Sequence, residues 1–389
     1  MKRIQMIIFV TIVLSIYILG NLYIFNKGYS IPALRDNRLV YGLIFFSLAF
    51  AFIAAKIFES RHSSVITDIL NVIGGFWMAY LLYGFLLFFL SDIILLLLRL
   101  LKATTPENIL HYKKWSYIVT VTLSSILIIG GFINALIPTV TTYNVKINKP
   151  AGEIKSMRIA AVSDIHLGSI IRKRSMVKLS GMITELKPDI VLLLGDIVDG
   201  EIGPVLRGDL LKYFTCPKCD EGLYAITGNH EFIGGSKHTI PYIESKGIRL
   251  LKDEMVTLDG GIQLIGRIDR DSHRFSSKER LTLSELMKQV DTTKPVILLD
   301  HQPYHLNEVS KSGVDLQLSG HTHNGQMWPL NYVTQKIFEL SYGYHRINNT
   351  HFIVSSGYGL WGPRVRSASR SEVLLVNVEF NGVEAAEIR

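Results

Sequence analysis

Two patterns of hydrophobic and polar residues divide the chain. Before residue 140, four long windows contain no charged residue: Ile4–Asn26, Leu39–Ala55, Ile69–Ser91 and a run from Trp115 past Ile137. A helix that crosses a bilayer needs about 20 apolar residues, so each window can span the membrane, the second only just. The sequence therefore predicts a transmembrane region of about four helices over residues 1–140.

Two details of this region have alternative interpretations. Lys2 and Arg3 before an apolar stretch also suit a signal peptide, but no A-x-A-like cleavage site follows, which favours a retained helix. Asp92 interrupts the longer apolar run Ile69–Leu101. It is either a buried intramembrane carboxylate or a sign that the span stops at Ser91 and that Ile93–Lys102 lies along the interface. The run exceeds what one crossing requires, which favours the second interpretation.

The pattern changes near Lys146, where charges return at normal density. Short β-rich runs then alternate with polar helical stretches, which predicts an α/β domain over residues 141–389. Arg172–Leu186 carries apolar residues at helical intervals and completes a βαβ unit. The polar stretch Asp269–Arg280 is expected to be an exposed loop. The expected strands are Met157–Ser163, Asp189–Leu194, Gly222–Thr227, Ile262–Ile268, Pro295–Leu299, Val314–Ser319, His351–Ser355 and Glu372–Phe380.

Composition and charge support a membrane protein and argue against a nucleic-acid partner. Hydrophobic residues make up 48% and charged residues 19% of the 389 residues, which is too apolar for a disordered or an ordinary soluble chain. Of the net charge of +8, residues 1–140 contribute eleven Lys and Arg against five Asp and Glu, and the remainder contributes 30 against 28. The basic excess therefore flanks the apolar windows, where it sets membrane topology.

The positions of the basic residues predict the orientation. The first and third loops carry seven Lys and Arg, and the opposite side carries four. Because positive residues favour the cytoplasmic side, these two loops are expected in the cytoplasm. Both termini and the α/β domain would then lie on the outer face of the cell membrane.

Residues suited to chemistry follow five of the expected strands. In α/β sheets the carboxyl ends of the strands form the edge at which ligands bind. Each of these five strands is followed by a carboxylate, an amide or an imidazole. The clusters are Asp164-Ile165-His166, Gly195-Asp196-Ile197-Val198-Asp199, Gly228-Asn229-His230-Glu231, Asp300-His301 and Gly320-His321-Thr322-His323.

These side chains form a coherent set of metal ligands. They offer two carboxylates, one amide oxygen and four imidazoles: Asp164, His166, Asp196, Asn229, His301, His321 and His323. Seven ligands suit two ions with one bridging carboxylate, and mixed oxygen and nitrogen ligation favours Mn²⁺, Fe or Zn²⁺. Two ions about 3.5–4 Å apart would activate a bridging water for in-line displacement at phosphorus. Glycines 195, 228 and 320 are expected to let the backbone turn sharply beside the ions.

The order of these motifs resembles the calcineurin-like metallophosphoesterase superfamily over roughly residues 150–389. Ser319–Pro329 and Gly357–Arg366 look like its bacterial branch, whose members are often membrane-attached. The resemblance implies a four-layer α/β fold, a β-sandwich flanked by helices. It implies one metal held by Asp164, His166, Asp196 and His323. It implies a second metal held by Asp196, Asn229, His301 and His321, with Asp196 as the bridge.

The same resemblance implies the catalytic pair. His230 would face the phosphate and protonate the leaving oxygen, and Asp199 would orient its imidazole, in keeping with general acid catalysis. Two positions depart from the family pattern. Asn324 stands where many members of the branch have Gly, and Asn tolerates a left-handed backbone. Gly200 stands where the protein phosphatases carry a phosphate-binding Arg, which disfavours protein phosphatase activity. Arg364 and Arg366 either supply that cation or lie in a solvated loop.

The two cysteines have no expected part in catalysis. Two Cys exclude a disulfide scaffold and a four-cysteine zinc site. Cys216 and Cys219 are spaced C-x-x-C, which is half a zinc site at most. They form either a local disulfide, if the domain is outside the cell, or two free thiols.

Three functions fit the sequence. The first is a membrane-anchored phosphoesterase with two metal ions that hydrolyses a phosphate ester or diphosphate, with a lipid-linked phosphate as the expected substrate class. The second is a pyrophosphohydrolase of the UDP-diacylglucosamine type in glycolipid synthesis, which requires a cytoplasmic catalytic face. The third is a non-catalytic, metal-binding signalling protein, against which the intact set of site residues argues. The sequence carries no indication of oligomeric state.

Overall fold

The computed structural model describes residues 2–59, 62–215, 221–275 and 279–381. The chain divides into two compact units. One comprises Met1–Phe132 with Gly362–Val365, and the other comprises Ile133–Trp361 with Arg366–Arg389. Cys216 and Cys219 lie outside the described residues, so the choice between a disulfide and free thiols stays a prediction.

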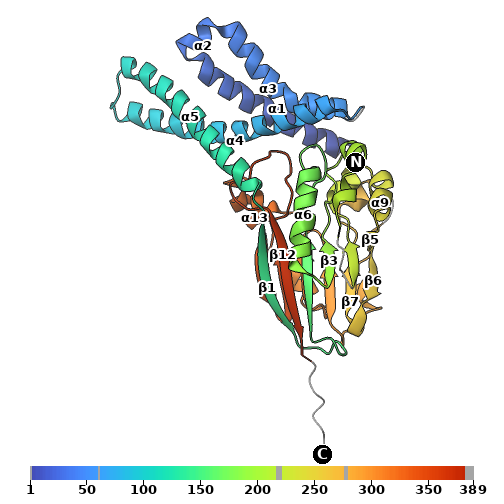
Figure 1. The fold of residues 1–389 in the computed structure, drawn as a ribbon. Helices are drawn as coiled ribbons and strands as arrows, with labels where there is room; N and C mark the ends of the chain where they lie inside the picture. The colour runs from blue at the N-terminus through green and yellow to red at the C-terminus, as the bar shows by residue number, and fades with distance from the viewer. Residues whose placement is uncertain (1, 60–61, 216–220, 276–278, 382–389) are drawn as a thin grey trace, which may run out of the picture. The chain divides into compact units, whose positions relative to one another are not determined.

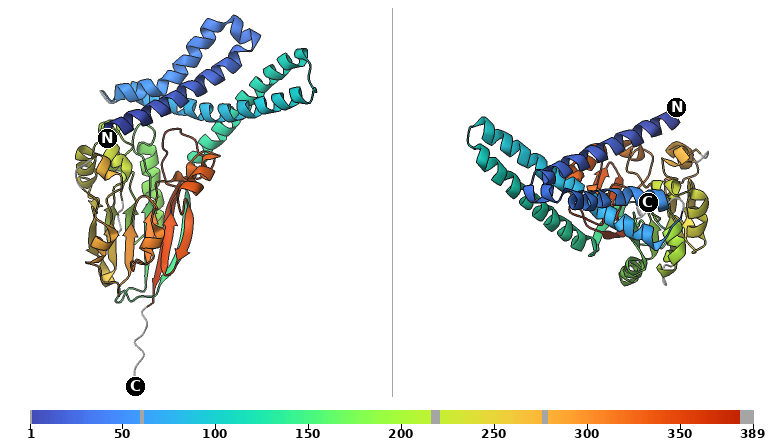
Figure 2. Two further views of the ribbon diagram at one scale, coloured as in Figure 1. Left: turned by 180° about the vertical axis from the view of Figure 1, so that it is seen from behind. Right: turned by 90° about the horizontal axis from the view of Figure 1, so that it is seen from above.

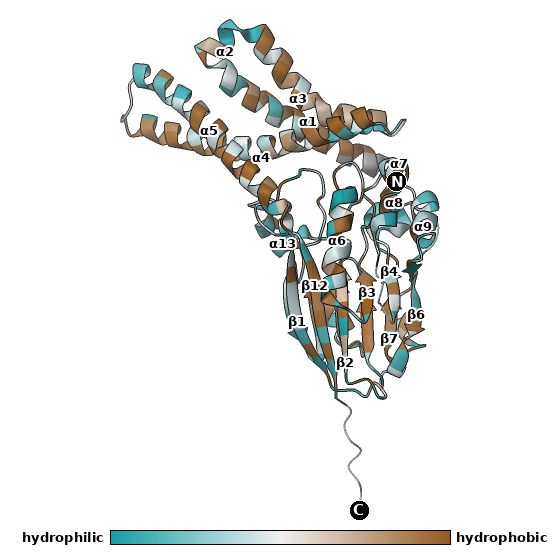
Figure 3. Ribbon diagram, viewed as in Figure 1, coloured by the Kyte–Doolittle hydropathy of each residue, from teal (hydrophilic) through white to brown (hydrophobic). Residues whose placement is uncertain are grey.

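The first unit is helical. Its helices are α1 (Lys2–Tyr29), α2 (Pro32–Asp36), α3 (Arg38–Glu59), α4 (Val65–Leu100) and α5 (Pro106–Ala135). Figures 1 and 2 show α1 and α3 as one helical hairpin and α4 and α5 as another, and Figure 3 shows hydrophobic residues along all four long helices. All four long helices are long and apolar enough to cross a membrane, which confirms the four predicted helices as candidate membrane spans.

Close packing between α3 and α4 depends on a small residue. A Cβ added at Gly74 would lie 2.5 Å from the Cα of Phe52, so only glycine lets the two backbones approach. Near the same interface, the rings of Phe45 and Trp77 meet edge to face at 4.8 Å. The helix α4 does not end at Ser91, because it continues through Asp92 to Leu100.

The second unit contains two six-stranded sheets. The first has the order β1 (Thr139–Ile147), β12 (Glu372–Phe380), β2 (Ser156–Val162), β3 (Ile190–Leu193), β4 (Gly222–Ala225) and β5 (Arg249–Leu250). The second has the order β10 (Gly343–Ile347), β11 (Thr350–Val354), β9 (Leu316–Ser319), β8 (Val296–Leu299), β7 (Gln263–Gly266) and β6 (Glu254–Thr257). Strands β2 to β5 run parallel, as do β7, β8, β9 and β11.

The alternation of side chains along each strand makes a layered structure. Ile297 and Leu299 of β8 point into the core between the sheets, which also contains Ile159 of β2. Their neighbours Val296 and Leu298 point to the opposite face, against the helices α11 (Leu283–Met287) and α12 (Leu306–Val309). Both faces of the strand are covered, as is usual for parallel strands.

Helices complete the layers outside the sheets (Figures 1 and 2). The longest, α6 (Lys173–Leu186), buries Met176, Leu179 and Ile183. The remaining helices are α7 (Gly203–Gly208), α8 (Asn229–Ile233), α9 (Ser236–Glu244), α10 (Ser272–Phe275) and α13 (Leu330–Ile337). This arrangement of two facing sheets between helices confirms the predicted α/β sandwich, all eight predicted strands and the predicted helix of the βαβ unit.

Candidate metal centre

The structure brings the seven predicted ligands together at the carboxyl ends of the strands. Asp164 and His166 follow β2, and Asp196 follows β3. The other four residues follow β4, β8 and β9, namely Asn229, His301, His321 and His323. Because these strands are parallel within each sheet, their carboxyl ends converge on one edge.

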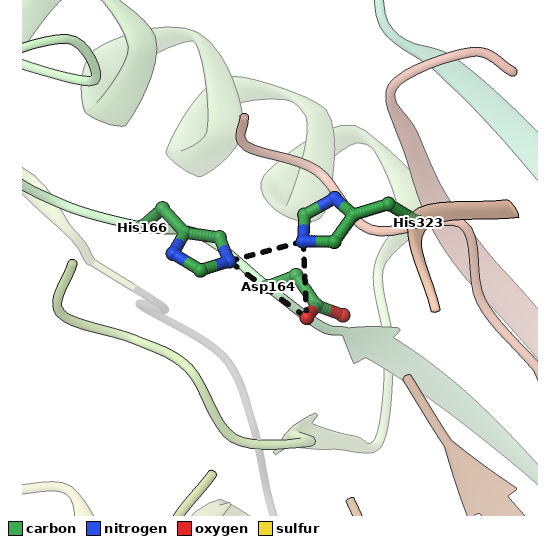
Figure 4. A group of neighbouring side chains, drawn as sticks. All are labelled: Asp164, His166 and His323. Atoms are coloured by element: carbon green, nitrogen blue, oxygen red, sulfur yellow. Dashed lines mark hydrogen bonds and ion pairs between the residues drawn. The ribbon is translucent and has the colours of Figure 1, made fainter. Parts of the chain in front are cut away.

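The first group of ligand atoms belongs to Asp164, His166 and His323. In Figure 4 these three side chains point toward one another. His323 Nε2 lies 3.1 Å from His166 Nε2 and 3.4 Å from Asp164 Oδ1. All three residues are buried. Two imidazole nitrogens and a carboxylate oxygen at this spacing can bind one transition-metal ion.

The second group belongs to Asp196, His301 and His321, with Asn229 beside it. His301 Nε2 lies 3.2 Å from Asp196 Oδ2. Asn229 Oδ1 lies 3.1 Å from His321 Nδ1. This group again combines nitrogen and oxygen donors without a thiolate, the set expected for Mn²⁺, Fe or Zn²⁺.

Asp196 lies between the two groups. Its Oδ2 is 3.8 Å from His166 Nε2 in the first group and 3.2 Å from His301 Nε2 in the second. Its other oxygen, Oδ1, accepts a hydrogen bond of 2.9 Å from the backbone N–H of His230. The carboxylate is therefore held in place by one oxygen while the other faces both groups.

Two imidazoles are held in the tautomer that metal binding requires. His301 Nδ1 donates to the carbonyl oxygen of Leu194 at 2.7 Å, and its buried Nε2 has no hydrogen-bond partner among the described residues. His166 Nδ1 similarly lies 3.3 Å from Asp199 Oδ1. Each Nε2 then presents a lone pair to the site, which is how metal-binding histidines are commonly oriented. The residues present therefore fit a metal centre.

The charge states also suit metal binding. Burial and the neighbouring His301 lower the pKa of His321 to about 4, and burial likewise lowers the pKa of His323 well below its usual value. Both imidazoles are neutral at neutral pH, as ligands must be. Burial raises the pKa of Asp196, but the imidazoles of His301 and His230 outweigh it and hold that pKa well below the usual range. The site thus presents an ionised Asp196 with neutral His321 and His323, whereas the Asp196 and Asp164 carboxylates outweigh burial and raise the pKa of His301.

The backbone at the site is held in an unusual conformation. Five predicted ligands have left-handed φ angles between 49° and 72°, although none of them is glycine: Asp164, His166, Asp196, His321 and His323. Such backbone strain is rare for non-glycine residues and is often found at functional sites, where surrounding contacts maintain it. Asn324 also has a left-handed φ of 46°, as expected from its tolerance of that conformation.

The three glycines differ in what they do. Gly195 has a φ of +91°, and a Cβ there would lie 2.7 Å from His301 Nδ1. Gly228 has an ordinary φ of −99°, so the expected sharp turn is wrong at this position. Its role is close approach, because a Cβ would collide with the Asp196 side chain. Gly320 likewise has no positive φ, and a Cβ there would collide with Ser163.

Glu231 organises the site, although no ligand or catalytic role is expected for it from the sequence. Its buried carboxylate accepts N–H groups from Asp196, Ile197, Val198 and Gly228 at 2.7–3.0 Å. It therefore fixes the loop that carries the bridging carboxylate. The sequence did carry a signal for this contact. A glutamate three residues after a helix N-cap, here Gly228, commonly accepts a hydrogen bond from the backbone N–H of that N-cap residue.

Asp199 contacts two imidazoles. Its Oδ1 lies 3.2 Å from His230 Nδ1 and 3.3 Å from His166 Nδ1. Burial alone would raise the pKa of Asp199, but the two imidazoles bring it well below its usual range. Burial lowers the pKa of His230, and the Asp196 and Asp199 carboxylates outweigh that effect and raise it to about 9. Asp199 thus supports a candidate ligand as well as the candidate acid.

One region beside the site differs from the prediction. Asp269 was expected in an exposed loop, but it is buried and accepts a hydrogen bond of 3.0 Å from the amide of Gln302. Burial raises the pKa of Asp269 to about 6. The sequence around it is uniformly polar, so no periodicity distinguished the buried carboxylate from its exposed neighbours.

Arg366 is neither a phosphate-binding cation nor a solvated residue. It is fully buried, and its guanidinium donates to the carbonyl oxygens of Ser356, Gly357 and Gly359. It therefore holds a loop beside His323, whose Nδ1 is 3.4 Å away. The guanidinium of Arg364 lies over the ring of Phe132 at 5.5 Å.

Comparisons with known proteins agree with this site. The family model for calcineurin-like phosphoesterases matches residues 157–325. An uncharacterized metallophosphoesterase of Aquifex aeolicus is 34% identical over 248 residues, which cover 62% of this chain and 92% of that protein. The chain therefore belongs to the calcineurin-like metallophosphoesterases, which are metal-dependent phosphoester hydrolases.

Two further relatives bear on the transmembrane region. An uncharacterized metallophosphoesterase of Campylobacter jejuni is 26% identical over 386 residues, which cover 96% of this chain and 98% of that protein. A Bos taurus protein named as a transmembrane protein with a metallophosphoesterase domain is 28% identical, over 66% of this chain and 60% of its own length. Together with the four apolar helices, these matches support a membrane protein.

Proposed function

We propose that the chain is a membrane-anchored phosphoesterase that binds two divalent ions and hydrolyses a phosphate ester or diphosphate of a lipid-linked substrate. The observation that carries the proposal is the position of Asp196, whose Oδ2 faces a complete ligand group on either side. One ion would be held by Asp164, His166, Asp196 and His323. The other would be held by Asp196, Asn229, His301 and His321.

The protein side chains have distinct tasks in this proposal. Two bound ions would supply an activated water and would neutralise charge on the attacked phosphate. His230 stands next to Asn229 on α8, and its side chain is 13% exposed, so it can face a substrate. Its raised pKa keeps it protonated at neutral pH in the ion-free site, as a general acid requires. Asp199 holds the imidazole through Nδ1, which leaves Nε2 for the leaving oxygen.

The membrane unit supports the proposed substrate class. A single helix is enough to tether an enzyme, whereas this chain has four candidate spans. Additional spans are useful where the substrate itself is part of the membrane. For this reason we propose that the enzyme acts on a phosphorylated group carried by a lipid. The mixed nitrogen and oxygen donors of the site favour a native metal pair drawn from Mn, Fe and Zn.

Hydrolysis assays on the purified full chain in detergent test this function. We expect hydrolysis of p-nitrophenyl phosphate that stops after chelation and returns with Mn²⁺, Fe²⁺ or Zn²⁺. A panel of phospholipids, polyprenyl phosphates and nucleotide-activated glycolipids should then give faster turnover than the free phosphorylated head groups. No hydrolysis with any metal would contradict the proposal. Faster turnover of the free head groups would contradict the lipid-linked class alone.

We further propose that the catalytic unit lies on the outer face of the membrane. The support is the excess of Lys and Arg in the first and third loops, seven against four. Alkaline phosphatase fused after Arg389 should therefore be active, and green fluorescent protein at the same place should be dark. The opposite pattern would place the catalytic unit in the cytoplasm and favour the glycolipid pyrophosphohydrolase.

A further inference from the structure

The membrane unit contains a polar pocket that the proposed phosphoesterase chemistry does not use. It has a volume of about 280 Å³ and lies among α1, α4 and α5. Lys27 and Asp92 form an ion pair in its wall, and the hydroxyl of Tyr23 donates to Asp92 at 2.6 Å. Ion pairs within membrane-spanning helices are rare and are commonly functional.

The pocket has an unpaired positive charge. Asp92 is already neutralised by Lys27 and hydrogen-bonded by Tyr23. Lys113 of α5 also lines the pocket, and in the described ranges its ammonium makes no ion pair or hydrogen bond. The pocket therefore has two cations against one anion. Of the other polar lining residues, Ser30 and Tyr112 donate their hydroxyls to backbone carbonyl oxygens, Ser91 and Ser116 bond to each other, and Asn26 offers a side-chain amide.

The pocket lies at one end of the helices. Lys27 is two residues from the end of α1, Asp92 is eight residues from the end of α4, and Lys113 is seven residues after the start of α5. At 1.5 Å per residue, Asp92 is about 12 Å from the helix end. All three residues thus lie toward the same end of the helical unit, which places the polar pocket in one half of the candidate spans.

A second, apolar cavity lies next to the first, nearer the middle of the helices. It has a volume of about 580 Å³ and shares Phe88 with the polar pocket. On α4 the lining residues of both cavities recur every three or four positions, so they form one face of the helix: Ile73, Phe76, Trp77, Tyr80, Leu81, Gly84, Phe88, Ser91, Asp92 and Leu95. The two cavities therefore lie one after the other along one face of α4, and together they are called the slot below.

The opposite wall is built in the same way. On α5 the polar pocket is lined by Lys113 and Ser116, and the apolar cavity is lined by Tyr117, Val121 and Ser124. The wall thus changes from charged to apolar along α5, in the direction that leads from its first turns toward its middle. An amphiphile with an anionic head group and a hydrocarbon chain has the same order of charged and apolar parts.

We infer that this slot binds one anionic phospholipid, with its phosphate between Lys27 and Lys113 and an acyl chain in the apolar cavity. The charge of the pocket selects the anionic head group, and the 580 Å³ cavity is within the usual size of ligand sites. The site belongs to the membrane unit alone. It goes beyond the proposed phosphoesterase activity and does not depend on it.

The head-group contact can be tested with adjacent lysines. Delipidated protein is exposed to equimolar phosphatidylglycerol and phosphatidylcholine with the same acyl chains, and retained lipid is measured by native mass spectrometry. We expect phosphatidylglycerol to be preferred in wild type. K113Q should lower its retention about fivefold, the factor for one lysine near an anionic lipid. K114Q is the matched control, because Lys114 does not line the pocket, and it should retain the wild-type preference.

The contact with the acyl chain of the lipid can be tested with two valines on α5. Val121 lines the apolar cavity and Val119 does not, although the two side chains are similarly exposed, at 41% and 48%. V121F should fill the cavity and reduce retention of phosphatidylglycerol, and V119F should not. Inorganic phosphate and glycerol phosphate should fail to displace the lipid, which separates a lipid site from a site for soluble phosphate.

Several outcomes would overturn the inference. Equal retention of the two lipids, equal behaviour of K113Q and K114Q, or displacement by inorganic phosphate would each do so. Hydrolysis of p-nitrophenyl phosphate in detergent should be the same in K113Q, V121F and wild type. Loss of lipid selectivity with intact hydrolysis would therefore report on the lipid site alone. Absence of hydrolysis in wild type would contradict the proposed function alone.

Discussion

The metal centre of the α/β unit and the polar pocket of the membrane unit are both clusters of charged side chains, but they are held in different ways. Asp164, His166 and Asp196 are almost fully buried, and backbone groups hold many of the side chains. Lys27 and Asp92 are 25% and 42% exposed. The partners of Asp92 are the side chains of Lys27 and Tyr23 on α1, which lie 65 and 69 residues earlier in the sequence.

This difference indicates two kinds of site. The candidate metal centre is pre-organised, because left-handed backbone and buried hydrogen bonds fix most of the candidate ligands in the ion-free structure. The polar pocket is adaptable, because rotatable lysine and tyrosine side chains form it. A substitution in the first should therefore have a large and specific effect, and a substitution in the second should have a smaller effect.

The largest difference is expected for the candidate acid. H230A should lower the rate on an alkyl phosphate by about 10²–10⁴-fold, since an alkoxide must be protonated as it leaves. With p-nitrophenyl phosphate, whose leaving group departs without a proton, the loss should be small. Steady-state kinetics on both substrates measure this. H238A is the control, because His238 is exposed and outside the site.

Metal content should be unchanged in H230A. An equal loss on both substrates, or a loss of metal, would mean that His230 binds a metal or clamps the phosphate.

A smaller effect is expected for Asp199, which contacts both His230 and His166. D199N should weaken metal binding by about 10–100-fold, because outer partners of metal-binding imidazoles fix their tautomer. It should also reduce the dependence on the leaving group. Metal titration followed by inductively coupled plasma mass spectrometry measures the affinity, with E201Q as a nearby carboxylate control. Unchanged affinity in D199N would limit Asp199 to a role at His230.

The smallest effect is expected in the membrane unit. D92N should lower the free energy of unfolding by about 1 kcal/mol or less, because the ion pair is partly exposed and Tyr23 can still bond to the amide. Thermal unfolding in detergent measures it against D36N, whose carboxylate is 71% exposed. A loss of several kcal/mol would make the pocket as rigidly built as the metal centre and would remove the contrast between them.

The same contrast explains what could be predicted from the sequence. The candidate metal ligands directly follow apolar strands, so their positions could be predicted from the sequence: His301 follows β8, and His321 follows β9. Strand periodicity predicted the eight strands for the same reason. The strand β1, at Thr139–Ile147, was missed because it directly follows an apolar run and pairs with β12, more than 200 residues later.

The remaining features depend on tertiary contacts. The pairing of Lys27 with Asp92 depends on the packing of α1 against α4, and neither residue lies in a motif. The burial of Asp269 depends on Gln302, which is 33 residues away. Glu231 was within reach of sequence reasoning, but its four N–H partners include three from the loop after β3.

The central claim is that Asp196 joins two metal sites, and metal stoichiometry tests it most directly. Inductively coupled plasma mass spectrometry of the metal-loaded protein should find two ions per chain in wild type. D196N removes the shared negative charge between two dications, so it should retain fewer ions and lose turnover. Two ions per chain in D196N, with a rate within about tenfold of wild type, would contradict the assignment of Asp196 as the bridge.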